Sequence, residues 1–519
     1  MSKIKSLILG SAAVIAASAG AQAADLPVKA KAVQYVKICS LYGAGFYYIP
    51  GTDTCIKLGG YVQADWNINA GNYGKPAWDE GGFRANGTDG RDSDYFTTRA
   101  RVQLNIDTRT ATEYGVVRTY WSSNFEHSTG FGPSSGNLTM DYGFVQFAGF
   151  TIGKAVSGFQ TPWGAYGANN NTSFLLGGYD NATGINQIAY TWQFGNGVSA
   201  QVGIEDNRVI NRAQLLDSSL EFYNPDNTSV QGVAGLTAAR AVLGQGVYAN
   251  SYGGNVSPDF VGNIRIDQAA FTAQLSGAVH NIHATYYSGP TGLPNGIVET
   301  NGHPEDAWGF AIAGGLQLKN LPTGPGDKLS LDATYADGAM KYLISGVTGN
   351  NFNHFSGGSN GFYNSFAVLG LFDGVYGTGG KIEKTTGWAV RGAYVHNWTP
   401  NWESSLFGSY TSIDYNATAS AGICAVQAKA IARVPGGAQG AGYSCNPDFN
   451  IWQVGTRTAW TPVKNLTFSG EVMYTQLDQS NTGSIAVNGQ NVGANMPAGS
   501  YEYKDQGIWS GNLRVRRTW

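Results

Sequence analysis

Residues 96–107 read FTTRARVQLNID, and their apolar and polar side chains alternate almost without a break. Successive side chains of a β-strand point to opposite faces, so this period of two predicts a strand with one apolar face and one ionic face. Residues 466–478 repeat the pattern, with Glu471 and Met473 in the polar row. Both segments therefore predict strands that separate two different environments.

Comparable segments of nine to fourteen residues recur along the chain after Cys55. We count sixteen, near residues 55–68, 95–107, 112–123, 138–148, 150–158, 187–195, 198–207, 263–275, 279–288, 307–318, 328–337, 386–398, 402–414, 449–461, 466–478 and 507–519. The connections alternate in length, since the odd ones cover 14 to 55 residues and the even ones 1 to 9. Bacterial outer-membrane barrels have short periplasmic turns, long external loops and an even number of strands. This alternation predicts an all-β transmembrane antiparallel β-barrel of sixteen strands over residues 55–519.

The barrel interpretation also predicts which face of each strand meets lipid. An Arg or Lys near the middle of the lipid-facing band would cost about 2–4 kcal/mol, so we expect the ionic row to line the interior. A soluble barrel of sixteen strands would place its apolar row inside, but its cavity would be too wide for side chains to fill. We therefore expect the interior to hold water.

The composition agrees with this fold and excludes several others. The 519 residues include 73 Gly, 13 Trp, 29 Tyr and 23 Phe, whereas charged residues make up only 13%. Beyond the N-terminus, no stretch reaches the roughly 18 consecutive apolar residues that a membrane-spanning helix needs. The formal net charge of −3 gives no electrostatic case for a nucleic-acid partner, since phosphate binding needs clustered basic charge.

The N-terminus has the three parts of a secretory signal peptide. Lys3 and Lys5 form a basic start, an apolar core follows, and residues 21–23 (AQA) offer small side chains for cleavage. We expect residues 1–23 to be removed, so that the mature chain begins at Ala24. The mature chain would then carry 30 basic and 35 acidic residues, a balance of −5.

Four cysteines in an exported chain predict disulfide bonds. Cys39 lies near Cys55 in the sequence, and Cys424 lies near Cys445. We therefore expect two local bridges, each worth about 3 kcal/mol if it acts through the entropy of the unfolded chain. A metal site is a poor alternative, because the four form no CxxC pair and no His lies at ligand spacing beside them. We place residues 24–54 at the periplasmic end of the barrel, as a plug or turn that the first bridge holds.

Residues 33–66 read VQYVKICSLYGAGFYYIPGTDTCIKLGGYVQADW, after a mature start of ADLPVKA. This segment closely resembles the N-terminal signature of the general diffusion porins of alphaproteobacteria, the rhizobial and Brucella type. Residues 95–120 and the closing strand are similar to the same family. The resemblance implies a sixteen-stranded outer-membrane barrel that assembles as a homotrimer and passes small hydrophilic solutes and ions without energy input or a cofactor. Its partners would be outer-membrane lipid and lipopolysaccharide.

The resemblance also implies that the third external loop folds into the channel and narrows it. The third long connection, about 159–186, is rich in Gly and Asn, contains Trp163 and Tyr179, and has Asp180 as its only charge. A loop exposed to water would not need so many apolar residues, so we expect this loop to pack inside the barrel wall.

Arginines dominate the charges that we expect to face the interior. The candidate pore-lining and constriction residues are Arg99, Arg101, Arg118, Asp141, Asp180, Asp332, Arg391, Arg457, Glu471, Arg514 and Arg516. Local lining charge sets the barrier to an ion, so we predict a mild preference for anions despite the negative net charge of the chain. The alternative is that cross-strand carboxylates neutralise several of these arginines, which would then only stiffen the wall.

Nothing in the sequence resembles an active site. Residues 357–361 satisfy GxSxG, but no strand precedes them and no helix follows, as a nucleophile elbow needs. The six histidines form no HExxH pattern, so we expect neither a catalytic nor a metal site. Two rival functions stay open: a substrate-selective channel, in which aromatic residues would guide sugars, and, less favoured, an outer-membrane hydrolase. The loops near 208–262, 338–385 and 415–448 could also serve phage or host recognition.

Overall fold

The computed structural model describes residues 37–70, 94–130, 132–163, 175–179, 184–207, 213–219, 250–288, 298–344, 351–356, 365–433, 437–487 and 499–519. The chain divides into a short N-terminal unit that ends at Ile56 and a large unit from Lys57 to Trp519. The two units are described separately below.

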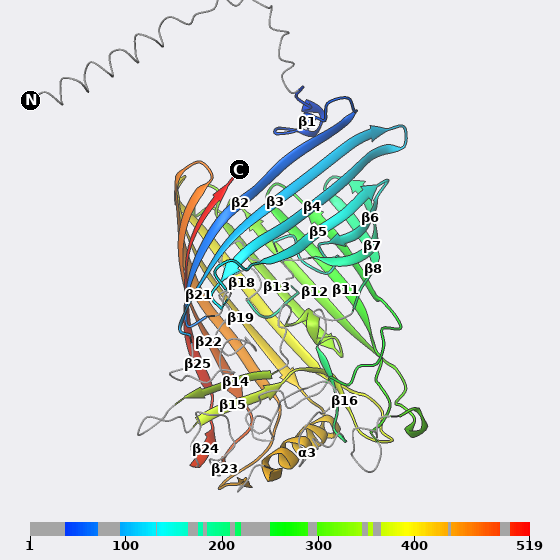
Figure 1. The fold of residues 1–519 in the computed structure, drawn as a ribbon, viewed down its shortest axis with the longest axis vertical. Helices are drawn as coiled ribbons and strands as arrows, with labels where there is room; N and C mark the ends of the chain where they lie inside the picture. Colours follow the sequence, from blue (N-terminus) through cyan, green and yellow to red (C-terminus); the bar gives the residue numbers. More distant parts are fainter. Residues whose placement is uncertain are drawn as a thin grey trace, which may run out of the picture. The chain divides into compact units, whose positions relative to one another are not determined.

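Sixteen antiparallel strands form a closed barrel, as the alternation predicts (Figure 1). They are β2 (Thr54–Ile68), β3 (Phe96–Thr112), β4 (Gly115–Ser128), β5 (Asn137–Phe147), β6 (Phe150–Ala155), β7 (Ile185–Gly195), β8 (Val198–Glu205), β10 (Asp259–Asp267), β11 (Phe271–Ile282), β12 (Ala307–Lys319), β13 (Lys328–Asp337), β18 (Thr386–Thr399), β19 (Trp402–Asp414), β21 (Phe449–Val463), β22 (Leu466–Gln479) and β25 (Gln506–Thr518). Each barrel strand pairs with the next one along the chain. The last strand, β25, pairs with β2 from Tyr61↔Thr518 to Ile68↔Gly511, which closes the wall. A closed wall has no unpaired sheet edge.

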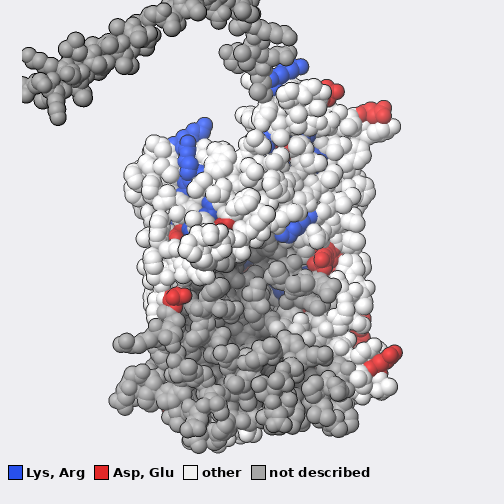
Figure 2. Space-filling model, viewed as in Figure 1, with Lys and Arg blue, Asp and Glu red and all other residues white. Residues whose placement is uncertain are grey.

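The two faces of the wall differ as the alternation predicts. On β2, Val62 and Trp66 are 48% and 38% exposed, whereas Gln63 and Asp65 are only 2% and 1% exposed. Figure 2 shows broad areas of the described surface without a charged residue. An apolar outer band over a polar inner row is the pattern of a barrel that spans a membrane. The ionic row therefore faces the interior.

The structure corrects the position of one predicted hairpin. Strands were expected at 263–275 and 279–288, but β10 and β11 lie earlier in the chain. The turn between them begins at Gln268, whose backbone N–H donates to the carbonyl oxygen of Phe271 at 2.8 Å. Gly277, in the expected turn, instead continues the ladder and pairs in register with both neighbouring strands. A glycine in an ordinary extended conformation is thus no sign of a turn here.

The hairpin of β3 and β4 is longer than expected. Residues 108–111, the predicted turn, continue the ladder, and the turn begins at Glu113. Thr108 pairs with Thr119 across the two strands, where β-branched side chains suit a pleated sheet. Because β4 also extends to Ser128 and β5 begins at Asn137, the second external connection is shorter than the 14 to 55 residues predicted for the long connections.

The short N-terminal unit is held by the first predicted disulfide. The 3-10 helix η1 (Ser40–Tyr42) is followed by β1 (Tyr47–Tyr48), which pairs with the first residues of β2. Cys39 is bonded to Cys55, and both cysteines form a small buried cluster with Phe46. The disulfide compensates for the small apolar core of this unit, because it restricts the conformations of the unfolded chain.

The long connections carry secondary structure of their own. One sheet contains, in order, β14 (Asn351–Ser356), β15 (Ser365–Gly370), β24 (Gly499–Tyr503), β23 (Ser484–Val487) and β20 (Ala438–Gln439); a smaller one contains β17 (Glu383–Lys384), β16 (Phe372–Tyr376) and β9 (Gln214–Asp217). The helical elements in their described residues are η5 (Glu299–Asn301), η6 (Met340–Tyr342) and α3 (Ala417–Arg433). The second predicted disulfide joins Cys424 on α3 to Cys445. Within the described ranges, no helix combines the length and the apolar character needed to cross a membrane.

Candidate functional site: the interior of the barrel

The described residues of the third external connection lie against the inner wall of the barrel. This segment, called loop 3 below, joins β6 to β7 and covers residues 156–184, slightly earlier than predicted. Asn263 on β10 donates to the carbonyl oxygen of Gly158 at 2.6 Å. Gln453 on β21 accepts from the backbone N–H of Leu176 at 2.8 Å. The predicted packing inside the barrel is therefore confirmed for the described residues of loop 3.

Apolar residues on the inner wall mark one place where loop 3 packs. Trp163 of loop 3 forms a buried cluster with Phe407 on β19 and Met473 on β22. Gly315 on β12 makes room for the indole ring, since an added Cβ would lie 2.6 Å from it. This contact explains why Met473 interrupts the polar row of its strand. Asp180, the predicted charge of loop 3, lies outside the described residues.

The inner faces of β25, β2, β3 and β4 carry most of the predicted arginines and are called the arginine wall below. Arg99 donates to Asp65 Oδ2 from Nη2 at 2.8 Å, and Arg514 donates to Oδ1 of the same carboxylate from Nε at 2.6 Å. Arg516 donates from Nε to the neutral amide oxygen of Gln63 at 2.7 Å. One carboxylate thus serves two guanidinium groups, which leaves an excess of positive charge at this level.

Two further ion-pair groups lie on the arginine wall. Arg101 binds Glu126 on β4 at 2.6 Å. Nearer the β3–β4 turn, Arg109 and Arg118 are Cα partners across the ladder, and both bind Asp107, at 3.1 and 3.0 Å. Like charges directly opposite each other destabilise a sheet, so the shared carboxylate is needed to hold this pair.

Aromatic rings lie beside Arg118 on the inner face. Its guanidinium carbon is 5.3 Å from the centre of the Tyr120 ring and 5.5 Å from that of Phe144. The two rings stack with their centres 5.4 Å apart. Asp141, on the same strand as Phe144, is 5% exposed and accepts a hydrogen bond from Asn124.

The remaining predicted residues lie on later strands. Arg391 on β18 binds Asp332 on β13, with Nε and Oδ1 2.8 Å apart and only 2% of each side chain exposed. Arg457 on β21 binds Glu403 on β19 and is the Cα partner of Glu471 on β22. Cross-strand carboxylates thus accompany these arginines, as the alternative interpretation expected.

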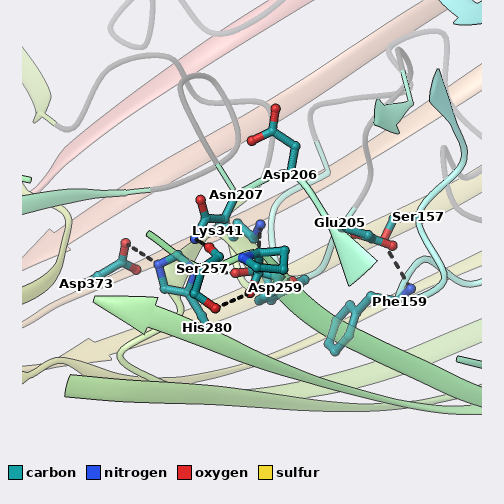
Figure 3. Close-up of polar contacts among 12 residues, drawn as sticks. Ser157, Phe159, Glu205, Asp206, Asn207, Ser257, Asp259, His280, Lys341 and Asp373 are labelled. Carbon is teal, nitrogen blue, oxygen red and sulfur yellow. Dashed lines mark hydrogen bonds and ion pairs between the residues drawn. The ribbon is translucent and has the colours of Figure 1, made fainter. Parts of the chain in front are cut away.

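The structure also brings together a buried charge cluster that the sequence interpretation missed (Figure 3). Asp259, at the start of β10, is 0% exposed and accepts from Nδ1 of His280 on β11 at 2.7 Å. Lys341 on η6 lies 2.5 Å from the other carboxylate oxygen of Asp259. Asp373 on β16 lies 3.7 Å from Nε2 of His280. The predicted strand begins at residue 263 and so leaves Asp259 in a loop. The sequence interpretation therefore did not place Asp259 on the inner face of the strand that pairs with β11, which carries His280.

The histidines and the GxSxG pattern were the sequence features closest to a metal or nucleophile site. Within these ranges, no group of three His, Cys, Asp or Glu side chains could hold a metal ion. His283 pairs with Asp306 at 2.7 Å, and not with His280. Residues 357–361, which carry the GxSxG pattern, lie outside the part of the chain that the structure describes.

Comparisons with known proteins identify the family. The sequence matches the family model described as "Porin subfamily" over residues 25–512. It is 33% identical to Porin Omp2b of Brucella suis over 271 residues, which are 50% of this chain and 62% of that protein. It is 35% identical to Porin Omp2b of Brucella abortus (strain 2308) over 212 residues, which are 39% of this chain and 54% of that protein. The chain thus spans a little over half the length of these curated relatives.

A solved structure shows the same fold. The outer membrane channel DcaP of Acinetobacter baumannii superposes with a TM-score of 0.55 at 16% identity, over 91% of this chain and 99% of that one. At this identity the likeness concerns the fold alone. The family match covers nearly the whole chain and agrees with the closed barrel. The chain therefore belongs to the porin subfamily, as its resemblance to the Brucella-type porins implied.

Proposed function

We propose that the protein forms a water-filled channel in the outer membrane for passive diffusion of small hydrophilic solutes and ions. One observation carries the proposal: the closed wall turns apolar side chains outward and an ionic row inward. Arg101 and Arg118 in this row keep 18% and 29% of their side chains exposed, which in a lipid bilayer requires water inside. Family membership and the barrel fold point to a channel rather than an enzyme.

Liposome swelling tests this passage. Vesicles that contain the purified protein should swell in isotonic sugar solutions, at rates that fall as the sugar becomes larger. Swelling no faster than that of protein-free vesicles, even with the smallest sugar, would contradict the proposal. Heat-denatured protein reconstituted in the same way is the control.

The proposed channel prefers anions mildly. Asp65 is shared by Arg99 and Arg514, and Arg109 and Arg118 also share one carboxylate, so basic groups outnumber acidic ones in both clusters. The predicted lining residues on the arginine wall would set the local potential that an ion meets. Reversal potentials in a salt gradient should show a chloride preference, and a clear cation preference would refute it.

A substrate-selective channel is the second candidate, because aromatic rings line part of the interior. Tyr120 and Phe144 are partly exposed on the inner face and stack beside Arg118. Such rings could bind the apolar face of a sugar or an aromatic solute. Saturable block of the conductance by one solute class would favour this candidate over free diffusion.

The proposal includes export and cleavage of the chain. The basic, apolar and small-residue pattern of residues 1–23 supports removal near Ala23 and Ala24, and the two disulfides fit an oxidising compartment. Residues 24–54 would then lie on the periplasmic side, ahead of a barrel formed by residues 55–519. The intact mass of the protein purified from outer membranes tests the cleavage site.

We also propose a homotrimer in contact with outer-membrane lipid and lipopolysaccharide. Support comes from an apolar groove on the outer wall, whose lining includes Trp66, Trp402, Trp460, Phe468 and Leu513. A second copy or an acyl chain would fill such a surface. Chemical crosslinking in detergent should give a product of three chains, and a single-chain product alone would contradict the trimer.

A further inference from the structure

Loop 6, which joins β13 to β18 over residues 338–385, inserts a short segment into the barrel. Residues 339–344, which include η6, are called the wedge below. Their exposed fractions are Ala339 0%, Met340 0%, Lys341 3%, Tyr342 0%, Leu343 0% and Ile344 3%. A segment of an external loop that is buried over its whole length is held by its surroundings and in turn supports them.

Both limbs of loop 3 contact the wedge. On the outgoing limb, the centre of the Phe159 ring lies 4.4 Å from that of the Tyr342 ring. On the returning limb, the backbone N–H of Gly177 donates to the carbonyl oxygen of Leu343 at 2.9 Å, and the next residues form a parallel bridge. The position of loop 3 therefore depends on the position of the wedge.

Two wall carboxylates face each other where the wedge meets the barrel. Glu205 on β8 and Asp259 on β10 are Cα partners, 3% and 0% exposed. Glu205 accepts from the Ser157 hydroxyl and from the backbone N–H of Gly158, both at 2.9 Å, so it holds the outgoing limb of loop 3. Like charges at a buried cross-strand pair repel strongly unless a cation lies beside them.

The wedge supplies that cation (Figure 3). Lys341 Nζ lies 2.5 Å from Asp259 Oδ2, and the hydroxyl of Tyr342 donates to the same oxygen at 2.7 Å. His280 lies between two carboxylates: Asp259 is 2.7 Å from Nδ1, and Asp373 is 3.7 Å from Nε2, where the Tyr252 hydroxyl lies 3.1 Å from the same nitrogen and donates to Asp373 at 2.8 Å. Two facing carboxylates favour the protonated imidazolium. The cluster then contains three carboxylates and two cations, a net charge of −1.

We propose that the wedge sets the bore and the solute size limit of the channel by holding loop 3, with Lys341 as the positioning residue. Lys341 acts through Asp259 and Glu205 on the outgoing limb of loop 3, and its neighbour Tyr342 acts on Phe159. Without the lysine charge the buried cluster would carry −2, and Glu205 would no longer be held where it binds loop 3. The inference rests on the proposed channel function and names the residues that regulate its width.

Lys341→Met tests the proposal, with unitary conductance in planar bilayers and sugar-dependent liposome swelling as readouts. A released loop 3 should widen the channel. The conductance should rise by about twofold, and larger sugars should enter than in the wild type. Lys381→Met is the matched control, because this lysine lies in the same loop with 80% of its side chain exposed, and the conductance should not change. Adding Asp259→Asn to Lys341→Met removes the carboxylate charge that faces Glu205 across the ladder and should return the conductance most of the way to the wild-type value. Such rescue would not follow from a general loss of stability.

A folded Lys341→Met protein with wild-type conductance and sugar limit would overturn the proposal. If this variant does not assemble, Phe159→Ala decides, because it removes the ring contact with Tyr342 from the loop 3 side and leaves the charges unchanged. The same widening is expected, and wild-type conductance would overturn the proposal. A wild-type protein that conducts no ions would instead refute the channel function itself, so the two failures are distinguishable.

Discussion

Asp332 on β13 and Arg391 on β18 lie directly opposite each other in the barrel wall and form an ion pair at 2.8 Å. Loop 3 covers this pair, since Arg391 also donates to the carbonyl oxygen of Leu175 at 3.4 Å. An arginine that the sequence alone assigns to the pore lining is thus paired and covered. The net charge of the lining therefore depends on which arginines share a carboxylate.

Asp332→Asn should destabilise the barrel, because it removes the negative charge that Asp332 places 2.8 Å from the buried Arg391 guanidinium. Breaking a buried pair in this way costs about 3–5 kcal/mol. Denaturant unfolding of the purified protein measures the loss. Asp267→Asn is the control: its ion pair with Lys319 is more than half exposed on the aspartate side, and such pairs are worth about 1 kcal/mol or less. Equal losses in the two variants would contradict the prediction.

Asp65→Asn should strengthen the anion preference, because Arg99 and Arg514 would lose the carboxylate that they share. The reversal potential in a potassium chloride gradient should move toward the chloride equilibrium potential. Glu299→Gln makes the same change of charge on an exposed residue of η5 and should leave the reversal potential unchanged. A shift toward the potassium potential in Asp65→Asn would contradict the excess of positive charge on the arginine wall.

Most of the fold could be predicted from the sequence, because side chains that face lipid alternate with side chains that face water along the barrel strands. The β10–β11 hairpin could not be placed, since its turn at Gln268 lacks the usual turn residues. The outward row of Ile264 and Ile266 does continue back to Phe260, and this signal would have extended β10 to Asp259.

The partners of the predicted site residues were harder to predict. Which carboxylate faces an arginine depends on the register between strands, and turn lengths fix that register. A one-residue error in a turn therefore changes every cross-strand pair. Met473, an apolar residue in a polar row, was the available sign that loop 3 packs on β22. Lys341 had no such sign, because the path of a long loop follows no short-range periodicity.

Acid should weaken the β12–β13 turn through Asp327. Burial opposes ionisation of this carboxyl, but hydrogen bonds from Thr323, from the backbone N–H of Asn397 and from His396 outweigh it and hold the pKa of Asp327 below its ordinary value. A carboxyl with a lowered pKa stabilises the folded state above its unfolded pKa of about 4, and this contribution is lost as the pH falls through the folded pKa. Asp327→Asn should therefore lower the melting temperature at pH 7 more than at acidic pH. The exposed Asp53→Asn serves as control, and a uniform shift at all pH values would contradict the assignment.

Replacing Cys424 and Cys445 with serine should loosen α3 and leave the barrel intact. The bridge closes a separation of 21 residues, worth about 3 kcal/mol through the entropy of the unfolded chain. Protease added to proteoliposomes should cut the connection between β19 and β21 faster in the double variant. The Cys39→Ser, Cys55→Ser variant should not show faster cleavage there. Equal cleavage rates in all three proteins would argue against a stabilising role for the second bridge.

Ion passage through the barrel can be recorded on the purified wild-type protein in planar lipid bilayers. An interior open to water lets ions cross without a bound carrier, so conductance should follow the bulk concentration of salt. The current should rise in uniform steps as single channels insert, with each step proportional to salt concentration. Folded and inserted protein that produces no current steps would show that the interior is closed, and would contradict the channel.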